Sequence, residues 1–597
     1  MGRDPVDIAS MFPPQVLRQY ALLADGERGA LIGPHGDIAW MCAPRWHSDA
    51  VFSTLIGGGG AYVVTPCGTR HVWGGYYESG GLIWRSRWIT TEGAIECREA
   101  LAYPGDPGRV ILLRQVAALH GDAKVRVLLE PRARFGHYAN GHLSCHDGVW
   151  TGRTGPLRWR WTGAADAVPV PSAHGAGEVL VAELVVPEGE RHDLVFEIAD
   201  ELAQDLVDPR TSWAATEATW ARGHPDLHAA VAQRDAGHAW AVLRGLTSTG
   251  GGTVAAVTMS LPERAGANRS YDYRYAWIRD QSYAGLAAAA AGATDLLDRS
   301  TGFITARLLA DGPRMRPAYT VTGDVVPGEE QLGLPGYPGG TDKVGNWVNR
   351  QFQLDAFGEA LQLLAAAARL DRLDADGLRA IQVAVDVIGE RWRDAEAGIW
   401  ELDDRCWTQS RLACVSGLRA VAERPGLGLD VPAVTTLADT ILADTAASSL
   451  HPDGYWQRSP DEPGVDGSLL LAPVRGALPR DDPRTRATLR AVHEQLVDDG
   501  FVYRFRHDER DLGEAEGAFL LCGFMLALAE HQQGRHWHAA RCFERNRAAC
   551  GPPGLFSEEY DVTQRQLRGN LPQAFVHALL LETAATLVPP DAERVPL

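Results

Sequence analysis

Residues 208–246, "DPRTSWAATEATWARGHPDLHAAVAQRDAGHAWAVLRGL", mark the point at which the character of the sequence changes. Apolar residues recur there at helical spacing, and the Gly-His-Pro triplet at 223–225 interrupts the pattern. We interpret the stretch as a linker helix followed by the first helix of a second domain. The regions before and after it therefore belong to different fold classes.

The region before residue 205 has the pattern of antiparallel β-structure. Four segments alternate around a short turn, which is the signature of a β-hairpin. These segments are residues 30–44, 82–103, 109–131 and 177–199, with turns at Pro34–Gly36, Thr91–Gly93, His120–Asp122 and Pro187–Gly189. Several short strands at such spacing predict an antiparallel β-sandwich.

The region after the linker is rich in Ala and Leu and amphipathic to its end. About eleven helices are predicted. They lie near residues 226–247, 280–293, 296–309, 350–370, 376–391, 408–422, 432–447, 484–499, 514–532, 536–548 and 571–587. We expect Asn570 to cap the last helix and Pro572 to lie in its first turn. Long Gly/Pro/aromatic loops such as residues 333–351 separate the helices and usually carry function. This pattern describes an (α/α) barrel, although a helical solenoid has the same periodicity.

The chain of 597 residues is too long for one ordinary core, so a multidomain β + α protein is expected. We predict a β-sandwich domain at residues 1–205, a helical linker at 206–228 and a helical barrel domain at 229–597.

Composition narrows the choice of partners and compartment. The net charge of -19 argues against nucleic acid, whose phosphates need a basic face. The nine cysteines are irregularly spaced without CxxC, which indicates reduced thiols and no zinc site. No secretory signal pattern and no run of 18 apolar residues occur, so no membrane span is predicted. We expect a cytoplasmic protein without cofactor or metal, since no Walker or GxGxxG motif is present. Its oligomeric state has no signature in the sequence.

The stretch "YDYRYAWIRDQSY", residues 271–283, places Arg279 and Asp280 among five aromatic residues. One interpretation is a structural ion pair at a helix entrance. The other is a pocket for a neutral, hydroxyl-rich ligand, with rings for its apolar faces and charges for its hydroxyls. In both cases Arg279 and Asp280 are expected to pair, so that loss of Arg279 would leave Asp280 without a partner.

Acidic residues gather in three loops. They are Glu401 beside Trp400, Glu514 and Glu516 before an apolar segment, and the adjacent Glu558 and Glu559. Glu residues ahead of a helix favour its positive end, and we attribute Glu514 and Glu516 to that effect. Hydrolysis of a glycosidic bond needs two carboxyl groups, one protonated to serve the leaving oxygen and one that activates water or attacks carbon. An apolar wall such as Trp400 would raise the pKa of the acid.

The chain resembles glycoside hydrolase family 15, the glucoamylase-like group, in its bacterial and archaeal branch. Residues 271–283 are similar to the family signature "WDYRYCWLRDA". Further family-like segments occur in the family order at residues 20–57, 345–361, 398–401, 516–528, 555–561 and 569–582. The resemblance covers nearly the whole chain. It implies an N-terminal antiparallel β-sandwich, a helical linker and a C-terminal (α/α)6 barrel.

The resemblance also implies hydrolysis of α-glucosidic bonds with inversion, releasing β-glucose. By motif, Glu401 matches the general acid and Glu558 the general base, with the adjacent Glu559 as the rival base. The residues that match the sugar-binding positions are Arg279, Asp280, Tyr273, Trp277 and, through "VYRFR", Arg504. The two catalytic carboxyl groups of an inverting enzyme are expected about 6.5–9.5 Å apart.

One loop departs from the family pattern. In "ELDDRCWTQSR", residues 401–411, Asp403 stands at the usual Arg position and Arg411 at the usual Lys position. This loop is expected to shape the site beyond the first glucose, so the preferred leaving group stays open. The expected function is an exo-acting hydrolase of short malto- or isomalto-oligosaccharides.

Three alternatives remain. A trehalase of the same family would use the same acid and base. A catalytically silent carbohydrate-binding scaffold belongs to another class, but both candidate glutamates are present. A transglycosylase or phosphorylase is also weighed; phosphorolysis would need an anion site where Glu558 stands.

Overall fold

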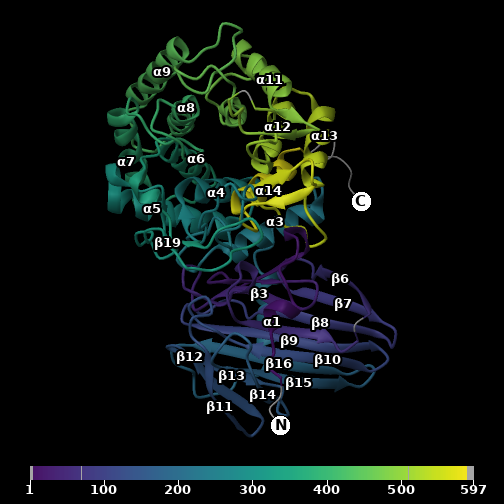
Figure 1. Ribbon diagram of the computed structural model, residues 1–597. Coiled ribbons are helices and arrows are strands. Elements are labelled where there is room, and N and C mark those ends of the chain that lie inside the picture. Colours follow the sequence, from purple (N-terminus) through teal and green to yellow (C-terminus); the bar gives the residue numbers. More distant parts are fainter. Residues whose placement is uncertain (1–3, 69, 509, 588–597) are drawn as a thin grey trace.

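A computed structural model describes residues 4–68, 70–508 and 510–587 of the chain. Figure 1 shows a block of β-strands below a ring of helices. The expected order of an antiparallel β-sandwich followed by a helical barrel is confirmed. The predicted barrel domain runs to residue 597, but residues 588–597 lie outside the described residues. The domain boundaries at 205 and 228 stay predictions.

The sandwich consists of two eight-stranded antiparallel sheets. The first has the order β1-β2-β3-β5-β10-β15-β14, with β4 paired to β3. Its strands are β1 (Ala21–Ala24), β2 (Gly29–Ile32), β3 (Asp37–Cys42), β4 (Ala50–Phe52), β5 (Ala61–Pro66), β10 (Ala123–Glu130), β14 (Val168–Pro171) and β15 (Glu178–Val186). Trp88, Trp159 and Phe196 belong to the apolar core of the sandwich.

The second sheet has the order β11-β12-β13-β16-β9-β8-β7-β6. Its strands are β6 (His71–Tyr77), β7 (Trp84–Thr90), β8 (Ala94–Leu101), β9 (Arg109–His120), β11 (Asn140–His146), β12 (Val149–Thr154), β13 (Leu157–Thr162) and β16 (Arg191–Ala199). The two sheets bury their inner faces against each other, as in other sandwiches.

The predicted hairpins are half correct. β2 pairs with β3, and β7 pairs with β8, as expected. The other two predictions are wrong, because β9 and β10 lie in different sheets, as do β15 and β16. The short turns between these strands carry the chain from one sheet to the other. A strand buries one face in either sheet, so its alternation does not reveal which sheet it joins.

The helices form two concentric rings. The inner ring consists of α4 (Ile278–Ala291), α6 (Asp355–Arg369), α8 (Thr408–Ala422), η5 (Gly467–Leu470) with α10 (Leu471–Val474), α12 (Leu520–Gln532) and α14 (Ala574–Thr586). Each contacts the next, and α14 returns to α4, which closes the ring. The inner helices are buried over most of their length; α12 is apolar and buried from Leu520 to Ala529.

The outer helices each pack on one or more inner elements. They are α3 (Gln233–Leu246), α5 (Thr294–Asp311), α7 (Ala375–Arg391), α9 (Val431–Ser448), α11 (Pro483–Gln495) and α13 (His536–Arg547). The eleven predicted helices are confirmed, whereas η5 with α10 was not predicted. The closed ring excludes a solenoid. α2 (Pro209–Ala221) is the expected linker helix, capped by Asp208 through Thr211 N at 2.8 Å. None of the helices in the described ranges combines the length and hydrophobicity that a membrane crossing requires.

The start predicted for the last helix is wrong. α14 begins at Ala574 with Gln573 as its N-cap, so Asn570 and Pro572 precede it. The Asn570 amide donates to the carbonyl of Tyr271 at 2.8 Å. A tertiary contact has therefore taken the side chain that the local capping pattern assigned to the helix.

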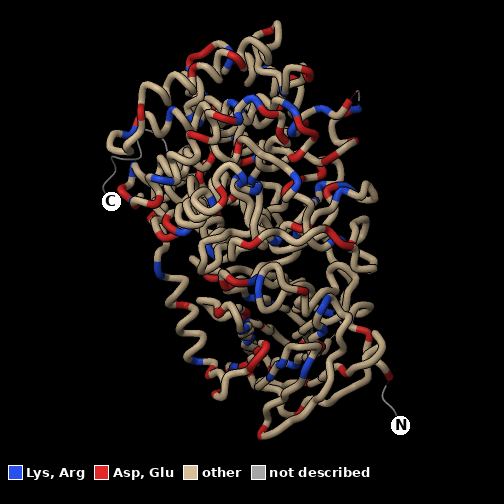
Figure 2. Tube along the Cα trace, turned by 90° about the vertical axis from the view of Figure 1, so that its left-hand side faces the viewer, with Lys and Arg blue, Asp and Glu red and all other residues tan. Residues whose placement is uncertain are grey.

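The sandwich supports a loop of the barrel that precedes α4. Trp40 Nε1 donates to the carbonyl of Val257 at 2.9 Å. Arg274, fully buried, donates to the carbonyl of Ser48 at 2.7 Å and pairs with Asp272. Residues of both parts also share one apolar cluster, which includes Trp46. Figure 2 shows charged residues of both signs interspersed over both parts of the molecule.

A buried ion pair links two inner elements that α12 separates. Arg475, at the end of α10, donates to Glu582 on α14 at 2.7 Å, and the two side chains are 10% and 9% exposed. We expect Arg475→Met to lower the free energy of unfolding by about 3–5 kcal/mol, because it leaves a buried carboxylate unpaired. Calorimetric unfolding measures the effect. Arg372→Met, which breaks the exposed pair with Asp298, is the control and should cost about 0–1 kcal/mol. Equal shifts in the two variants would contradict the expectation.

Candidate active site

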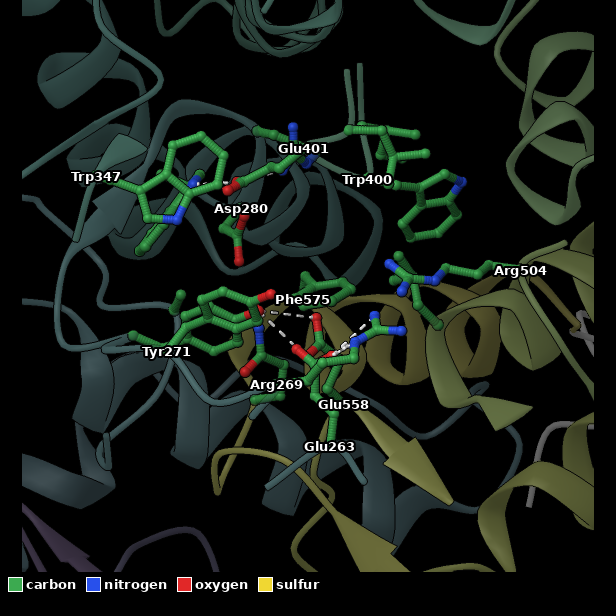
Figure 3. A pocket seen from close by; sticks show the side chains of 18 of the residues that line it. Glu263, Arg269, Tyr271, Asp280, Trp347, Trp400, Glu401, Arg504, Glu558 and Phe575 are labelled. Atoms are coloured by element: carbon green, nitrogen blue, oxygen red, sulfur yellow. Dashed lines mark hydrogen bonds and ion pairs between the residues drawn. The ribbon is translucent and has the colours of Figure 1, made fainter. Parts of the chain in front are cut away.

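One pocket lies at the amino-terminal ends of the inner helices, where the long loops meet. Its volume is about 280 Å³. Residues at the starts of α4, α12 and α14 line it together with residues of the loops (Figure 3). The lining comprises Ala255, Glu263, Arg269, Tyr271, Tyr273, Trp277, Arg279, Asp280, Trp347, Ile399, Trp400, Glu401, Leu402, Arg504, His507, Leu521, Glu558, Gln573 and Phe575. All eight site residues predicted from the sequence are among them.

Glu401 enters the pocket from the loop before α8. Its backbone φ of 54° lies in the left-handed region, which a non-glycine residue adopts only under constraint. Its Oε1 accepts from Trp277 Nε1 at 2.6 Å and from Arg279 Nη2 at 3.4 Å. Because Oε1 receives both donors, a proton on this carboxyl group belongs on Oε2. Burial raises the pKa of Glu401, and Arg279 opposes that rise. The net rise favours the protonated form of Glu401.

Glu558 lies on the other side of the pocket, immediately before β24 (Glu559–Asp561). Figure 3 shows Glu401 and Glu558 facing each other across the cavity. Tyr273 Oη donates to the Glu558 carboxylate at 3.3 Å. Burial and the neighbouring Glu263 raise the pKa of Glu558 well above its ordinary value, while Arg504 acts in the opposite direction. A carboxyl of this kind is a strong proton acceptor once it is ionised.

Glu559 points away from the pocket. Successive residues of a strand face opposite sides, and Glu559 is the first residue of β24. Its Oε2 accepts from Gly517 N at 2.7 Å, which ties it to the segment before β23 (Ala518–Phe519). It does not line the cavity that Glu558 lines. The geometry therefore favours Glu558 over Glu559 as the group that meets a ligand.

The prediction that Arg279 and Asp280 form an ion pair is wrong. Arg279 Nη1 donates to Gln353 Oε1 at 2.8 Å and to Asp355 Oδ2 at 3.1 Å. No ion pair joins Arg279 to Asp280, although the structure describes both. Adjacent residues of a helix do not face each other, and both lie in the first turn of α4. Arg279 is therefore matched by Asp355.

Asp280 instead projects toward the middle of the pocket between Glu401 and Glu558 (Figure 3). Its side chain is 4% exposed. Burial raises the pKa of Asp280 to about 7, and the charge of Glu401 adds to the shift in spite of Arg279. This carboxyl is placed to accept or donate hydrogen bonds to the hydroxyls of a neutral ligand.

Aromatic rings form the walls. Tyr273 packs edge to face on Trp277 with ring centroids 5.6 Å apart, and it stacks on Tyr271 at 6.2 Å. Trp400 is fixed by its Nε1, which donates to Asp466 at 2.9 Å. Together with the carboxyl groups these rings give the pocket alternating apolar and polar surface, which suits a sugar.

Glu516 has a different partner from the one expected. Its carboxylate does not serve the start of α12 but accepts from Arg504 Nη2 at 2.6 Å. His507 lies 2.8 Å from the same carboxylate, and Arg269 lies at 3.4 Å. Burial acts to raise the pKa of Glu516, but Arg504 and His507 outweigh it and lower the pKa to about 2. The pairing holds the Arg504 guanidinium at the pocket wall near Trp400.

Comparison with known proteins identifies the family. The model described as "Glycosyl hydrolases family 15" matches residues 242–585, more than half of the chain. The chain belongs to glycosyl hydrolase family 15. A second model, described as "Trehalase-like, N-terminal", matches residues 13–173. The enzyme is thus an O-glycosyl hydrolase, as the sequence resemblance implied.

Similar proteins carry two names. The trehalase of Mycobacterium tuberculosis is 29% identical, with 98% of this chain and 91% of that protein aligned. The trehalase of Mycolicibacterium smegmatis is 28% identical, with 98% and 92% aligned. A crystal structure of a bacterial glucoamylase complexed with acarbose superposes with a TM-score of 0.74 at 14% identity, covering 98% of this chain and 95% of that one. The structural match shows the sandwich and (α/α)6 barrel fold.

Several lining residues of the family 15 pocket were not predicted from the sequence. They are Glu263, Arg269, Tyr271, Trp347, His507, Gln573 and Phe575. Tyr271 and Trp347 lie in stretches that had been singled out, the aromatic stretch 271–283 and the loop 333–351. Their place in such loops was the available signal. Glu263 and Arg269 pair with each other at 3.0 Å, a contact that spacing alone does not reveal.

Proposed function

We propose that this family 15 enzyme hydrolyses α,α-trehalose to two glucose molecules, with inversion at the attacked carbon. The observation that carries the hydrolytic part is the placement of Glu401 and Glu558 on opposite sides of one small pocket. Its volume of about 280 Å³ lies close to the lower end of the usual range for ligand pockets, about 300–1,000 Å³. The trehalase-named relatives, aligned over nearly the whole chain, support trehalose over the malto- or isomalto-oligosaccharides first expected.

The sugar whose bond is cleaved would lie against Tyr273 and Trp277, with Arg279 and Asp280 on its hydroxyls. Arg504 and Trp400 border the same pocket and would contact either sugar. Charged groups beside rings provide both the hydrogen bonds and the apolar contact that a glucose ring needs.

Glu401 would act as the general acid. The proton on its Oε2 passes to the glycosidic oxygen as the bond between that oxygen and the anomeric carbon breaks. The first glucose then leaves with an intact hydroxyl. Trp277 and Arg279 hold Oε1 and so keep Oε2 directed at the substrate. Activity should fall as the pH rises through the pKa of Glu401.

Glu558 would act as the general base. It removes a proton from a water molecule whose oxygen attacks the anomeric carbon from the opposite face. The new carbon–oxygen bond has inverted configuration, and one water is consumed for each bond cleaved. Burial and Glu263 raise the pKa of Glu558, so it is a strong proton acceptor once ionised, and Arg504 and Arg269 partly offset that rise. The separation of about 6.5–9.5 Å between the two carboxyl groups stays a prediction.

We also place the enzyme in the cytoplasm. All nine cysteines are free thiols in the structure, which fits a reducing compartment. Its partner in the reaction is a small carbohydrate.

Substrate choice is tested by glucose release from equal concentrations of trehalose, isomaltose and maltotriose. We expect trehalose to give the highest kcat/KM, because only its aglycone is a single glucose joined through the anomeric carbon. A preference for isomaltose or maltotriose would overturn the trehalose assignment. It would support the hydrolysis of malto- or isomalto-oligosaccharides instead. Release from none of the three would favour the catalytically silent scaffold.

A further inference from the structure

Arg279 stands between two carboxyl groups. One end of its guanidinium reaches Oε1 of Glu401, the proposed acid, at 3.4 Å. The other end donates to Asp355 Oδ2 at 3.1 Å and to Gln353 Oε1 at 2.8 Å. Asp355 is fully buried as the first residue of α6, and it does not line the pocket. It therefore touches the acid only through Arg279.

Asp355 lies in a crowded group of buried side chains. Its Oδ1 has no hydrogen-bond partner among the described residues, so Arg279 and its charge are what the structure provides for this carboxylate. Glu359 follows one turn later on α6, and Glu396 precedes α8. Burial raises the pKa of Glu359 to about 7 and that of Glu396 to about 8. Of these three carboxyl groups, Asp355 is the one in direct contact with an arginine.

The titratable and charged groups around this contact come from several elements. On α4 they are Arg279, Asp280 and Tyr283, and Tyr273 precedes that helix. On α6 there is Glu359, on α8 Cys414, and in the loop before α8 Glu396 and Glu401. Arg279 is the one cation that the structure places in contact with both Asp355 and Glu401.

We propose that Asp355 is a positioning residue for the general acid: it holds Arg279 against Glu401 Oε1 and offsets the charge that Arg279 brings there. The inference rests on the proposed role of Glu401. With Asp355 in place, the guanidinium orients the carboxyl group without stripping its proton. The contact between Asp355 and Arg279 thus maintains both the orientation and the protonation of the Glu401 carboxyl group.

The sign of the effect follows from Coulomb interactions. Arg279 lowers the pKa of Glu401, and Asp355 raises it. A neutral residue at 355 leaves Arg279 uncompensated, so the acid loses its proton at lower pH. Since the general acid works only when protonated, the basic limb of the kcat profile should move to lower pH, by about one unit for a charge at this range.

The test compares Asp355→Asn with the unmodified enzyme on trehalose and on α-D-glucosyl fluoride. Fluoride leaves as an anion and does not need a proton from Glu401. We expect kcat/KM for trehalose to fall about 100-fold, as displacement of a catalytic group does, and that for the fluoride much less. A fall in kcat/KM that is common to both substrates measures the loss of glucose binding by Arg279. The additional fall on trehalose measures the loss of proton donation by Glu401.

Glu359→Gln is the matched control. Glu359 is a buried carboxyl on the same helix that accepts from Tyr283 at 3.3 Å and is not paired with Arg279. In this variant the basic limb of the kcat profile should stay at its original pH. The ratio of kcat/KM for trehalose to kcat/KM for the fluoride should also be unchanged. Asp355→Glu, which retains the charge, should restore the limb toward its original pH. If Asp355→Asn fails to fold, as judged by thermal unfolding, Asp355→Ser removes the same charge and takes its place.

The outcomes separate this inference from the proposed function. Equal losses on both substrates with an unmoved basic limb would overturn the role of Asp355. An unmodified enzyme that cleaves the fluoride and isomaltose but not trehalose would refute the trehalose assignment alone. The Asp355 comparison would then be made with isomaltose in place of trehalose, and it would support or overturn the inference in the same way.

Discussion

Glu558→Gln is expected to lower kcat for trehalose by about 100- to 10,000-fold, the usual contribution of a general base. Glutamine keeps an oxygen for the Tyr273 hydroxyl but does not take a proton from water. The fold should remain intact, because the carboxylate is buried next to Glu263 and its charge is a cost to the folded state. Steady-state kinetics and thermal unfolding of the same preparation measure both effects.

The stability of this variant has a definite sign. The pKa of Glu558 is raised in the folded state, so the stability that this group contributes is present below its unfolded pKa and is lost as the pH rises toward the folded value. A neutral glutamine removes that loss. We therefore expect the unfolding midpoint at neutral pH to stay or to rise while activity collapses.

Glu559→Gln is the control for this result. Glutamine retains the oxygen that accepts from Gly517 N, and residue 559 lies outside the pocket. Its kcat should stay within about tenfold of the unmodified enzyme, the range left to indirect effects. If Glu559→Gln were inactive and Glu558→Gln active, the general base would have to be reassigned to Glu559.

Glu401→Gln is expected to have a comparable effect, with a loss of about 100- to 10,000-fold in kcat for trehalose. The amide oxygen still accepts from Trp277 and Arg279, so the side chain keeps its place. What disappears is the proton for the leaving glucose. The basic limb of the pH profile should disappear with it.

A leaving group that needs no proton distinguishes this variant from a misfolded one. Turnover of α-D-glucosyl fluoride by Glu401→Gln should exceed its turnover of trehalose by a much larger ratio than in the unmodified enzyme. An unchanged ratio would remove Glu401 from the role of general acid. Near-normal activity on trehalose would do the same.

The order of the fold was accessible from the sequence, and parts of its topology were not. Alternation and turn residues indicated the strands, while helical spacing indicated α2 to α9 and α11 to α14. It did not indicate η5 or α10, which have four residues each and are too short to show a helical period. The same patterns did not reveal that the turns at Gly121 and Gly189 carry the chain between sheets, because strands of both sheets alternate alike. Asn570 shows the reverse problem: its capping signature was local, but its contact is with Tyr271.

The site was predictable where motifs mark it and obscure where only contact defines it. Glu401, Glu558 and the aromatic stretch 271–283 were singled out by their residue types, and the family resemblance gave them roles. The partner of Arg279 was misjudged, since Asp280 is its neighbour in sequence but Asp355 is its neighbour in space. Spacing says nothing of such pairs when 76 residues separate them. The pairing of Arg504 with Glu516, 12 residues apart, was also missed, because the local pattern assigned Glu516 to the start of α12.

The most direct test of the account is the anomeric composition of the glucose formed initially from trehalose, measured by proton NMR before mutarotation. Inversion changes one of the two α-linked carbons, so α- and β-glucose should form in equal amounts. This result would agree with Glu401 as acid and Glu558 as base on trehalose. Formation of α-glucose alone would mean retention and would contradict the mechanism. If no glucose formed, the assignment of trehalose as the substrate would be wrong.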